Sequence, residues 1–280
     1  MKILKITTSL ICIALIGFYG CKKGENKIDA NNKWVYLDST NTANIKIIQV
    51  FAGNTPQIPT ATNATTGPQV FIYANGQKLN GLSLGYGSVW PTSTSYGNIP
   101  SGNVKFDIIN ARMDLTVVPN VPKFIVGDTL GSFIATIDQG KYYSLYIGDT
   151  VPTVRVTLKE DIITTPATNT YRIRFANFSM NNNPTDTFNV FSKREGIEII
   201  TNIPHKDVSN WVQLPVPILT DTFEIRKKGS TLTYLTAVVS GQVSNPTSFS
   251  PAPLRNYSII IRGKTGVTSK TNIAPIYTNR

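Results

Sequence analysis

Histidine and cysteine are scarce in this chain of 280 residues, which contains one His and two Cys. A single imidazole excludes three-histidine zinc centres and HExxH metalloproteases, because both need at least two. Charged residues make up only 15% of the chain, and its 16 Asp plus Glu show no spaced pair of the kind that a glycosidase uses. We therefore expect neither a metal nor a cofactor.

Long amphipathic helices are missing too, since no helical apolar period persists beyond two turns. Thr, Asn, Ser, Val, Ile and Tyr are abundant instead, and the hydrophobic fraction of 41% is large enough for a core. Runs of strand length alternate with turn clusters, at 45–51, 70–74, 104–109, 133–137, 142–147 and 154–158. The sequence predicts an all-β protein.

The strand pattern is clearest in Val104-Lys105-Phe106-Asp107-Ile108, where apolar and charged residues alternate. Successive side chains of a strand point to opposite faces of the sheet. We therefore expect the three apolar residues to face a core and the two charged residues to face water.

A tight hairpin is predicted at Asn75-Gly76, which follows the run 70–74 and precedes 77–79. Both residues tolerate the positive φ angles that a two-residue hairpin turn requires. The two flanking runs are therefore expected to pair as antiparallel strands.

The first 20 residues resemble a bacterial secretory leader. Lys2 and Lys5 supply a positive start, and the apolar run 6–18 is too short to cross a bilayer of about 30 Å as a helix. We therefore expect residues 1–20 to be a cleaved signal peptide and not a transmembrane anchor.

A lipid anchor is predicted at Cys21. Residues 18–21, Phe-Tyr-Gly-Cys, resemble the lipobox of bacterial lipoproteins, whose cysteine receives the lipid and becomes the first residue of the mature chain. Cys12 leaves with the leader, so the mature chain can form no internal disulfide. The alternative is an ordinary cysteine behind a conventional signal. With the lipid attached, the protein is expected in the cell envelope, at the outer membrane.

Loss of the leader leaves a net charge of +9, from 25 basic and 16 acidic residues, against +11 for the whole chain. In an exported protein, such a charge favours phosphate-bearing envelope lipids or acidic glycans as partners. No nucleic-acid recognition motif is present, so no nucleic acid is expected. The alternative is a solvated basic surface without a specific partner.

Two strand patterns recur along the chain. Residues 45–51 align with residues 173–179, which pairs Lys46 with Arg174. Residues 141–148 align with residues 255–263, with Tyr-Ser in register. Such a recurrence indicates that one β module occurs twice.

We therefore predict two β modules at 43–158 and 169–264, joined by 159–168, behind a flexible tether at 21–42 and ahead of a C-terminal tail of unknown structure at 265–280. Short strands with frequent turns in about 100 residues favour a two-sheet sandwich. The predicted fold class is all-β, with two tandem immunoglobulin-like β-sandwiches after a lipoprotein signal peptide.

The order of motifs also resembles a known family. A basic-hydrophobic opening strand at 46–49, an Asn-Gly hairpin at 70–79, Ile-Pro-Ser-Gly at 99–102 and Gly-Lys-Tyr-Tyr-Ser-Leu at 140–145 look like domain of unknown function 4397. The resemblance covers most of 43–264. It implies immunoglobulin-like sandwiches, often in tandem in bacterial envelope lipoproteins, and it assigns no activity.

Residues 81–85, Gly-Leu-Ser-Leu-Gly, match the GxSxG nucleophile elbow of hydrolases, and His205 is the only available triad base. The elbow needs a strand, a tight turn at Ser83 and then a helix, whereas the Gly-Tyr-Gly that follows opposes a helix start. His205 is expected to be exposed in a turn. The acidic pair Glu160-Asp161 lacks the oxygen-dense loop of a calcium site. We expect no catalytic and no metal-binding residues.

Three aromatic residues, Tyr86, Trp90 and Tyr96, gather in the Gly-, Ser- and Pro-rich stretch 85–98. Exposed aromatic residues on loops at the end of a sandwich can stack on sugar rings or anchor a protein partner. The alternative is that some of them cap the core. Trp211 is expected in the core of the second module.

Together these features predict a non-enzymatic, lipid-anchored protein of the cell envelope that binds a glycan or a protein partner or acts as an adhesive module. One alternative is a structural spacer or display domain in an envelope assembly. A secreted hydrolase is the least favoured hypothesis.

Overall fold

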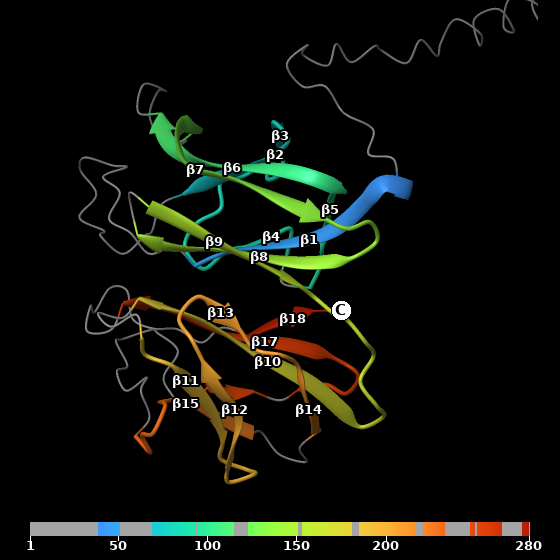
Figure 1. Ribbon diagram of the computed structural model, residues 1–280, viewed down its shortest axis with the longest axis vertical. Coiled ribbons are helices and arrows are strands. Elements are labelled where there is room, and N and C mark those ends of the chain that lie inside the picture. The colour runs from blue at the N-terminus through green and yellow to red at the C-terminus, as the bar shows by residue number, and fades with distance from the viewer. Residues whose placement is uncertain are drawn as a thin grey trace, which may run out of the picture. The chain divides into compact units, whose positions relative to one another are not determined.

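The computed structural model describes residues 39–50, 69–92, 94–114, 123–150, 153–180, 185–216, 221–232, 247–249, 251–264 and 276–279. The predicted leader, Cys21 and most of the predicted tether lie outside these residues. Eighteen strands and one short 3-10 helix, η1 (Ser39–Asn41), form the described part, which contains no α-helix (Figure 1). No helix among the described residues is long and apolar enough to cross a bilayer.

Two sheets form the first half of the fold. Sheet A has the strand order β4-β1-β8-β9, with β5 also paired to β1, and sheet B has the order β3-β2-β6-β7. The neighbours β1 and β8 run parallel, and the other pairs are antiparallel. The strands are β1 (Thr42–Gln49), β2 (Val70–Ala74), β3 (Gln77–Lys78), β4 (Val89–Trp90), β5 (Gly97–Pro100), β6 (Gly102–Asp114), β7 (Lys123–Ile137), β8 (Tyr142–Thr150) and β9 (Thr153–Glu160).

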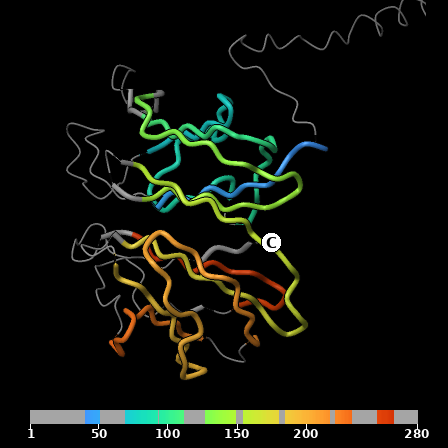
Figure 2. Tube along the Cα trace, viewed as in Figure 1, coloured from blue at the N-terminus to red at the C-terminus, as the bar shows by residue number. Residues whose placement is uncertain are grey.

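Two more sheets form the second half with the same strand order. Sheet C has the order β13-β10-β17-β18, with β14 also paired to β10, and sheet D has the order β12-β11-β15-β16 (Figure 2, yellow to red). Each strand of the first half thus has a counterpart nine strands later. The strands are β10 (Thr170–Met180), β11 (Phe188–Ser192), β12 (Ile197–Ile203), β13 (Asp207–Val208), β14 (Val212–Pro215), β15 (Asp221–Lys227), β16 (Thr247–Phe249), β17 (Asn256–Lys264) and β18 (Ile276–Asn279).

The register of the two parallel strand pairs agrees with the recurrence in the sequence. Lys46 of β1 lies opposite Ser144 of β8, and Arg174 of β10 lies opposite Ser258 of β17. The residues that the sequence aligns therefore occupy equivalent positions in sheets A and C.

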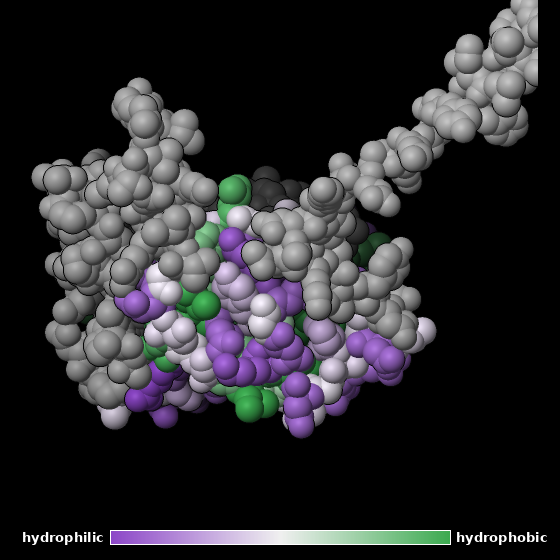
Figure 3. All heavy atoms as spheres, turned by 90° about the horizontal axis from the view of Figure 1, so that it is seen from above, coloured by the Kyte–Doolittle hydropathy of each residue, from purple (hydrophilic) through white to green (hydrophobic). Residues whose placement is uncertain are grey.

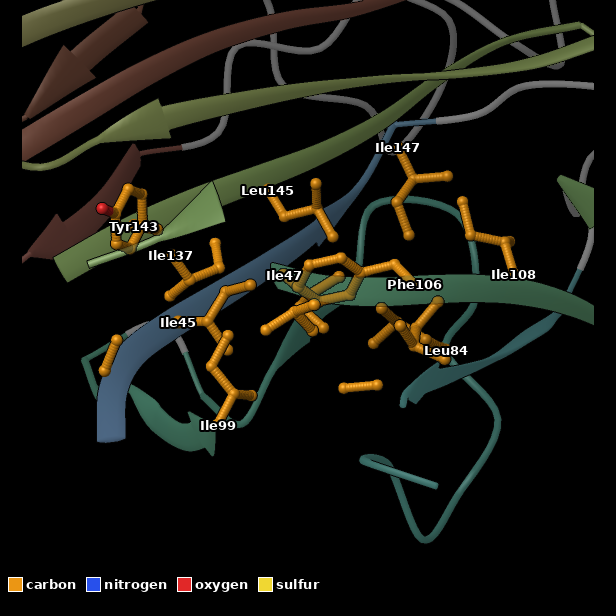
Figure 4. Close-up of a cluster of buried hydrophobic side chains, with 14 of the residues drawn as sticks. Ile45, Ile47, Leu84, Ile99, Phe106, Ile108, Ile137, Tyr143, Leu145 and Ile147 are labelled. Carbon is orange, nitrogen blue, oxygen red and sulfur yellow. The ribbon is translucent and has the colours of Figure 1, made fainter. Parts of the chain in front are cut away.

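Each half has its own apolar core. Between sheets A and B, side chains from both sheets meet in one buried cluster (Figure 4). The alternation predicted in β6 is confirmed, since Val104, Phe106 and Ile108 are buried in this cluster while Lys105 is exposed and Asp107 half-buried. A second cluster lies between sheets C and D, and its buried members are Tyr171, Ile173, Phe175, Phe188, Val190, Ile200, Leu214, Phe223, Ile225, Tyr257, Ile259 and Ile261.

The outer face of sheet B carries charged and polar side chains beside the exposed Ile134. Lys105 Nζ lies 3.0 Å from Asp107 Oδ1, and Ser132 donates a hydrogen bond to the same carboxylate. Hydrophilic residues cover much of the described surface seen from above, with scattered apolar patches (Figure 3). One face of sheet B thus meets the core and the other meets solvent, as alternating sequence predicts.

The predicted hairpin is confirmed. Asn75 and Gly76 have φ angles of 49° and 79°, and the turn joins β2 to β3 with Ala74 opposite Gln77. Asn75 Oδ1 also accepts a hydrogen bond from the Lys105 amide at 2.8 Å. A residue with this backbone conformation is strained unless it is glycine, or Asn or Asp with a local hydrogen bond.

We expect Gly76→Ala to lower the free energy of unfolding by about 1 kcal/mol, because a β-carbon is disfavoured at a positive φ angle. No atom lies within 4 Å of a β-carbon placed there, so the conformation alone is tested. Gly81→Ala is the matched control, since that site is equally open and lacks the positive φ angle. Urea unfolding of both variants measures the difference, and equal midpoints would contradict this explanation.

Regular structure extends beyond the predicted boundaries of the two β modules, into the predicted tether and into the predicted tail. The predicted tail 265–280 contains β18, which pairs with β17 and places Ile276 opposite Ile259. The predicted tether 21–42 ends inside regular structure, because η1 precedes a first strand that begins at Thr42. The second half therefore ends in a strand equivalent to β9, which the polar composition of the tail concealed.

Candidate functional site

The central strands β1 of sheet A and β10 of sheet C are buried on both faces. Ile45 and Ile47 of β1 point into the core shared with sheet B, and Lys46 and Ile48, which alternate with them, are buried on the opposite face. The same holds for β10, where Ala176 is buried on the face away from sheet D. We call the buried contact between sheets A and C the joint, and its apolar members are Ile48, Val50, Tyr146, Ala176, Phe178, Val208 and Ile260.

An aromatic pair stands at the centre of the apolar part of the joint. Tyr146 of β8 and Phe178 of β10 stack with ring centroids 4.7 Å apart and an interplanar angle of 16°. Gly148 permits this approach, because a β-carbon there would already lie 3.2 Å from Phe178 Cδ1. Residues Leu37–Arg280 accordingly form one compact unit.

A buried ion pair lies at the polar end of the joint. Asp161, which follows β9, binds Arg174 of β10, and the exposed fractions of these two residues are 2% and 1%. Arg174 Nη2 donates to Ser144 Oγ at 3.0 Å, and its Nε donates to Ser258 Oγ at 2.8 Å. Ser144 Oγ in turn donates to Asp161 Oδ2 at 2.6 Å. Each charged group therefore has an opposite charge and additional hydrogen bonds, which a buried ion pair needs to be tolerated.

Tyr96 completes this network from the first half. Its hydroxyl donates to Asp161 Oδ2 at 2.6 Å, and its ring packs edge-on against Tyr142 at 5.1 Å. Burial, together with the nearby Asp161 carboxylate, raises the pKa of Tyr96, so the phenol remains a neutral donor. The hydroxyl of this predicted ligand-contact residue is therefore occupied within the protein.

Lys46 is the second cation in the polar end of the joint. It is fully buried, and its Nζ lies 4.5 Å from the centroid of the Tyr96 ring. Burial lowers the pKa of Lys46 to about 7; Asp161 opposes this shift and Arg174 reinforces it. Lys46, Asp161 and Arg174 are each at most 2% exposed, so their contacts hold the two halves together.

Tyr86 and Gly87 form the opposite end of the joint. Arg262 of β17 is buried, and its guanidinium carbon lies 4.7 Å from the centroid of the Tyr86 ring. A β-carbon on Gly87 would overlap the same guanidinium, so the absence of a side chain makes room for Arg262. Tyr86 is therefore half-buried, with a cation from the second half over its ring.

Trp90 of the first half and Trp211 of the second half are both half-buried. Trp90 packs against the core between sheets A and B, over Gly97, where a β-carbon would lie 2.3 Å from Trp90 Cη2. Trp211 lies under the guanidinium of Arg174, with Cζ 4.6 Å from its centroid. The sequence placed Trp211 in the second core, whereas the structure places it beside the ion pair.

The Glu160-Asp161 pair separates into two environments. Glu160 is exposed and lies 3.1 Å from Lys141 Nζ, whereas Asp161 points inward to Arg174. The role of Asp161 was not predicted, because this residue lies in the predicted linker 159–168. The available signal was the alignment of Lys46 with Arg174, which marks equivalent positions in the two halves.

The residues suggested for a hydrolase are not arranged as a nucleophile elbow. Ser83 donates to Gln69 Oε1 at 3.1 Å, and the next residue, Leu84, forms an isolated bridge with Val70. The chain then enters a turn and β4, with no helix. His205 is half-buried in a turn between β12 and β13. No three His, Cys, Asp or Glu side chains of the described ranges lie together as a metal site.

Comparisons with known proteins identify one family domain in part of the chain and indicate no activity. The chain matches no curated protein. A similar solved structure is that of the Bacillus anthracis TIE protein, at 12% identity and a TM-score of 0.19, which covers 83% of this chain and 34% of that one. The chain thus spans about one third of that protein, and the low TM-score assigns no fold. Residues 57–188 match the model of the domain of unknown function DUF4397, and this part of the chain contains one domain of that family.

Proposed function

We propose that this chain is a non-enzymatic, lipid-anchored protein of the cell envelope that binds a glycan or an envelope protein. In this proposal the two halves are tandem immunoglobulin-like β-sandwiches, both related to DUF4397, and a lipid on Cys21 holds them at the outer membrane. The repeated strand order and the leader-like first 20 residues support it. The scarcity of His and of paired acids supports a function without catalysis.

The observation that carries a binding function is the fixed position of the aromatic residues in stretch 85–98. Tyr86 is held by Arg262 and Tyr96 by Asp161, yet both residues are only half-buried. Tyr142, packed edge-on against Tyr96, is 39% exposed. Aromatic side chains that are already immobilised lose little entropy on binding, so they suit stacking on a sugar or a protein side chain.

A glycan array and a pull-down from envelope extracts test this proposal with the chain lacking its lipid through Cys21→Ser. We expect binding, and we expect Tyr86→Ala to weaken it about tenfold, the usual loss for one stacked ring. Tyr73→Ala is the matched control, because Tyr73 is a half-buried tyrosine of β2 outside the stretch. Equal binding by the two variants would contradict a ligand contact at Tyr86.

A structural spacer is the second candidate, and the joint is the observation that favours it. A buried contact with stacked rings and an ion pair makes two halves into one stiff body, as a spacer requires. Failure of the chain to bind any glycan or envelope protein in the same assays would favour this function over binding.

Lipid attachment is expected to depend on one cysteine. Cys21→Ser should abolish incorporation of labelled fatty acid and move the protein from the membrane fraction to the soluble fraction, since acyl chains provide the anchor. Cys12→Ser is the matched control and should change neither, because residue 12 is expected to leave with the leader. Continued labelling of the Cys21→Ser variant would contradict the predicted anchor.

A further inference from the structure

Arg172 of β10 is a half-buried cation beside the polar end of the joint. Its Nη1 donates to Thr164 Oγ1 and to the carbonyl oxygens of Ile162 and Thr164, at 3.4 and 3.5 Å. Among the residues that the structure describes, its Nε and Nη2 make no hydrogen bond and no carboxylate forms an ion pair with it. The side chain is therefore held by one nitrogen, and the Nε–Nη2 edge of the guanidinium is unused.

The fold does not need a cation at this position. Asn44 of β1 lies opposite Tyr142 of β8, and Arg172 of β10 lies opposite Asn256 of β17. Asn44 and Arg172 are therefore equivalent, and the first half builds the same pair of parallel strands with an uncharged residue. Arg172 supplies the second half with a charge that strand pairing does not require.

Trp211, which precedes β14, places a flat apolar ring next to Arg172. The centroid of this ring lies 5.3 Å from Arg172 Cζ and 4.6 Å from Arg174 Cζ, so the ring is held in position. Trp211 is half-buried, and its indole N–H makes no hydrogen bond within the described ranges. An apolar ring beside unused donors suits a sugar, which has apolar ring faces and a rim of hydroxyl groups.

Exposed apolar side chains lie at the start of the segment that holds Arg172. Tyr142 is 39% exposed, and its carbonyl oxygen accepts a hydrogen bond from the Asp161 amide at 2.7 Å. Ile162, the next residue, is 64% exposed. A chain of several sugars bound at Arg172 would find further apolar contacts here.

The charges around Tyr142 favour a single acidic group over an anionic membrane as the partner. Asp138 and Glu160 are both exposed, and each forms an ion pair with Lys141, at 2.9 and 3.1 Å. Exposed carboxylates repel a negatively charged lipid surface. One unpaired arginine, in contrast, matches one carboxylate of a soluble ligand.

We propose that Arg172 and Trp211 form a binding site for a carboxylate-bearing sugar of an acidic glycan. The carboxylate accepts two parallel hydrogen bonds from Nε and Nη2 of Arg172, a geometry that the planar guanidinium favours. The sugar ring lies against the indole of Trp211. This proposal rests on the glycan-binding function proposed above and narrows it to acidic chains.

Calorimetric titration of the Cys21→Ser chain with oligosaccharides of galacturonate, glucuronate, mannuronate, guluronate and sialate tests the proposal. We expect at least one of them to bind, and its methyl ester, which lacks the charge, to bind about tenfold more weakly or worse. A failure of all five to bind would overturn the proposal. Equal affinity for sulfated dextran would also overturn it, because that result indicates attraction to net charge alone.

Arg172→Gln should weaken binding of the acidic oligosaccharide at least about tenfold and abolish the preference for the acid over its ester. Arg172→Lys keeps the charge without the planar edge, so it should recover only part of the affinity. Arg155→Gln is the matched control, because Arg155 is an exposed arginine of β9 in the first half, and its affinity should change less than about twofold. Equal affinities of the Arg172→Gln and Arg155→Gln variants would overturn the site.

Two outcomes separate this site from the proposed function. Glycan binding that depends on Tyr86 and is unchanged in Arg172→Gln would overturn the site and leave the binding function standing. Absence of binding to every glycan and every envelope protein would contradict the binding function, and the site with it.

Discussion

Asp161→Ala is expected to lower the free energy of unfolding by about 3–5 kcal/mol, the usual cost of leaving a buried charge without its partner. The substitution leaves the Arg174 guanidinium in the joint with uncharged contacts, namely the hydroxyls of Ser144 and Ser258 and the Trp211 ring. It also removes the acceptor of the Tyr96 hydroxyl. Urea unfolding measures the loss.

Glu160→Ala is the matched control, because Glu160 is the neighbouring acid and pairs with Lys141 at the surface. Exposed pairs contribute about 0–1 kcal/mol, so this variant should be nearly as stable as the wild type. Similar losses in the two variants would show that the buried ion pair has no special role.

The double variant Asp161→Leu with Arg174→Met separates an unpaired charge from a general disruption of the joint. Apolar residues of similar volume often replace a buried ion pair without loss of stability. We expect the double variant to recover most of the stability that Asp161→Ala loses. A loss in the double variant that equals or exceeds the single loss would contradict an origin in the unpaired Arg174.

Phe178→Ala is expected to cost about 3–5 kcal/mol, as large-to-small substitutions at buried aromatic residues do. The variant removes the ring that stacks on Tyr146 and leaves a cavity beside Gly148. Phe178→Leu keeps most of the volume and loses only the stacking, so its cost should be clearly smaller. Urea unfolding compares the two variants, and a cost below about 1 kcal/mol for Phe178→Ala would show that the joint contributes little to stability.

The strands were predictable because their signal is local. Alternation such as that from Val104 to Ile108 depends only on neighbouring residues, and the Asn75-Gly76 turn depends on two. The short strand at Ile276–Asn279 was missed, since four residues directly after Pro275 are too few to show alternation.

The joint could not be predicted in the same way. A polar residue within an apolar run normally indicates a solvent-facing side, and Lys46 and Gln49 of β1 fit that expectation, yet both are fully buried. Their burial results from the packing of sheet C on sheet A. No local pattern encodes that contact, and Asp161 meets Arg174 only after the chain has folded.

The contacts of the candidate aromatic residues could not be predicted from local sequence either. Composition placed Tyr86, Trp90 and Tyr96 on a loop, but it could not show that Arg262 and Asp161 would approach from residues far along the chain. The sequence alignment of Lys46 with Arg174 came closest, because it marked equivalent positions on the faces that meet.

The central claim is that the joint makes the two halves unfold as one body. Variants that keep a single tryptophan, either Trp90 in the first half or Trp211 in the second, report on each half by fluorescence during urea unfolding. If the joint couples the two halves, the fluorescence of Trp90 and that of Trp211 should change at the same urea concentration, as expected of one cooperative unit. Two transitions with separate midpoints would contradict it.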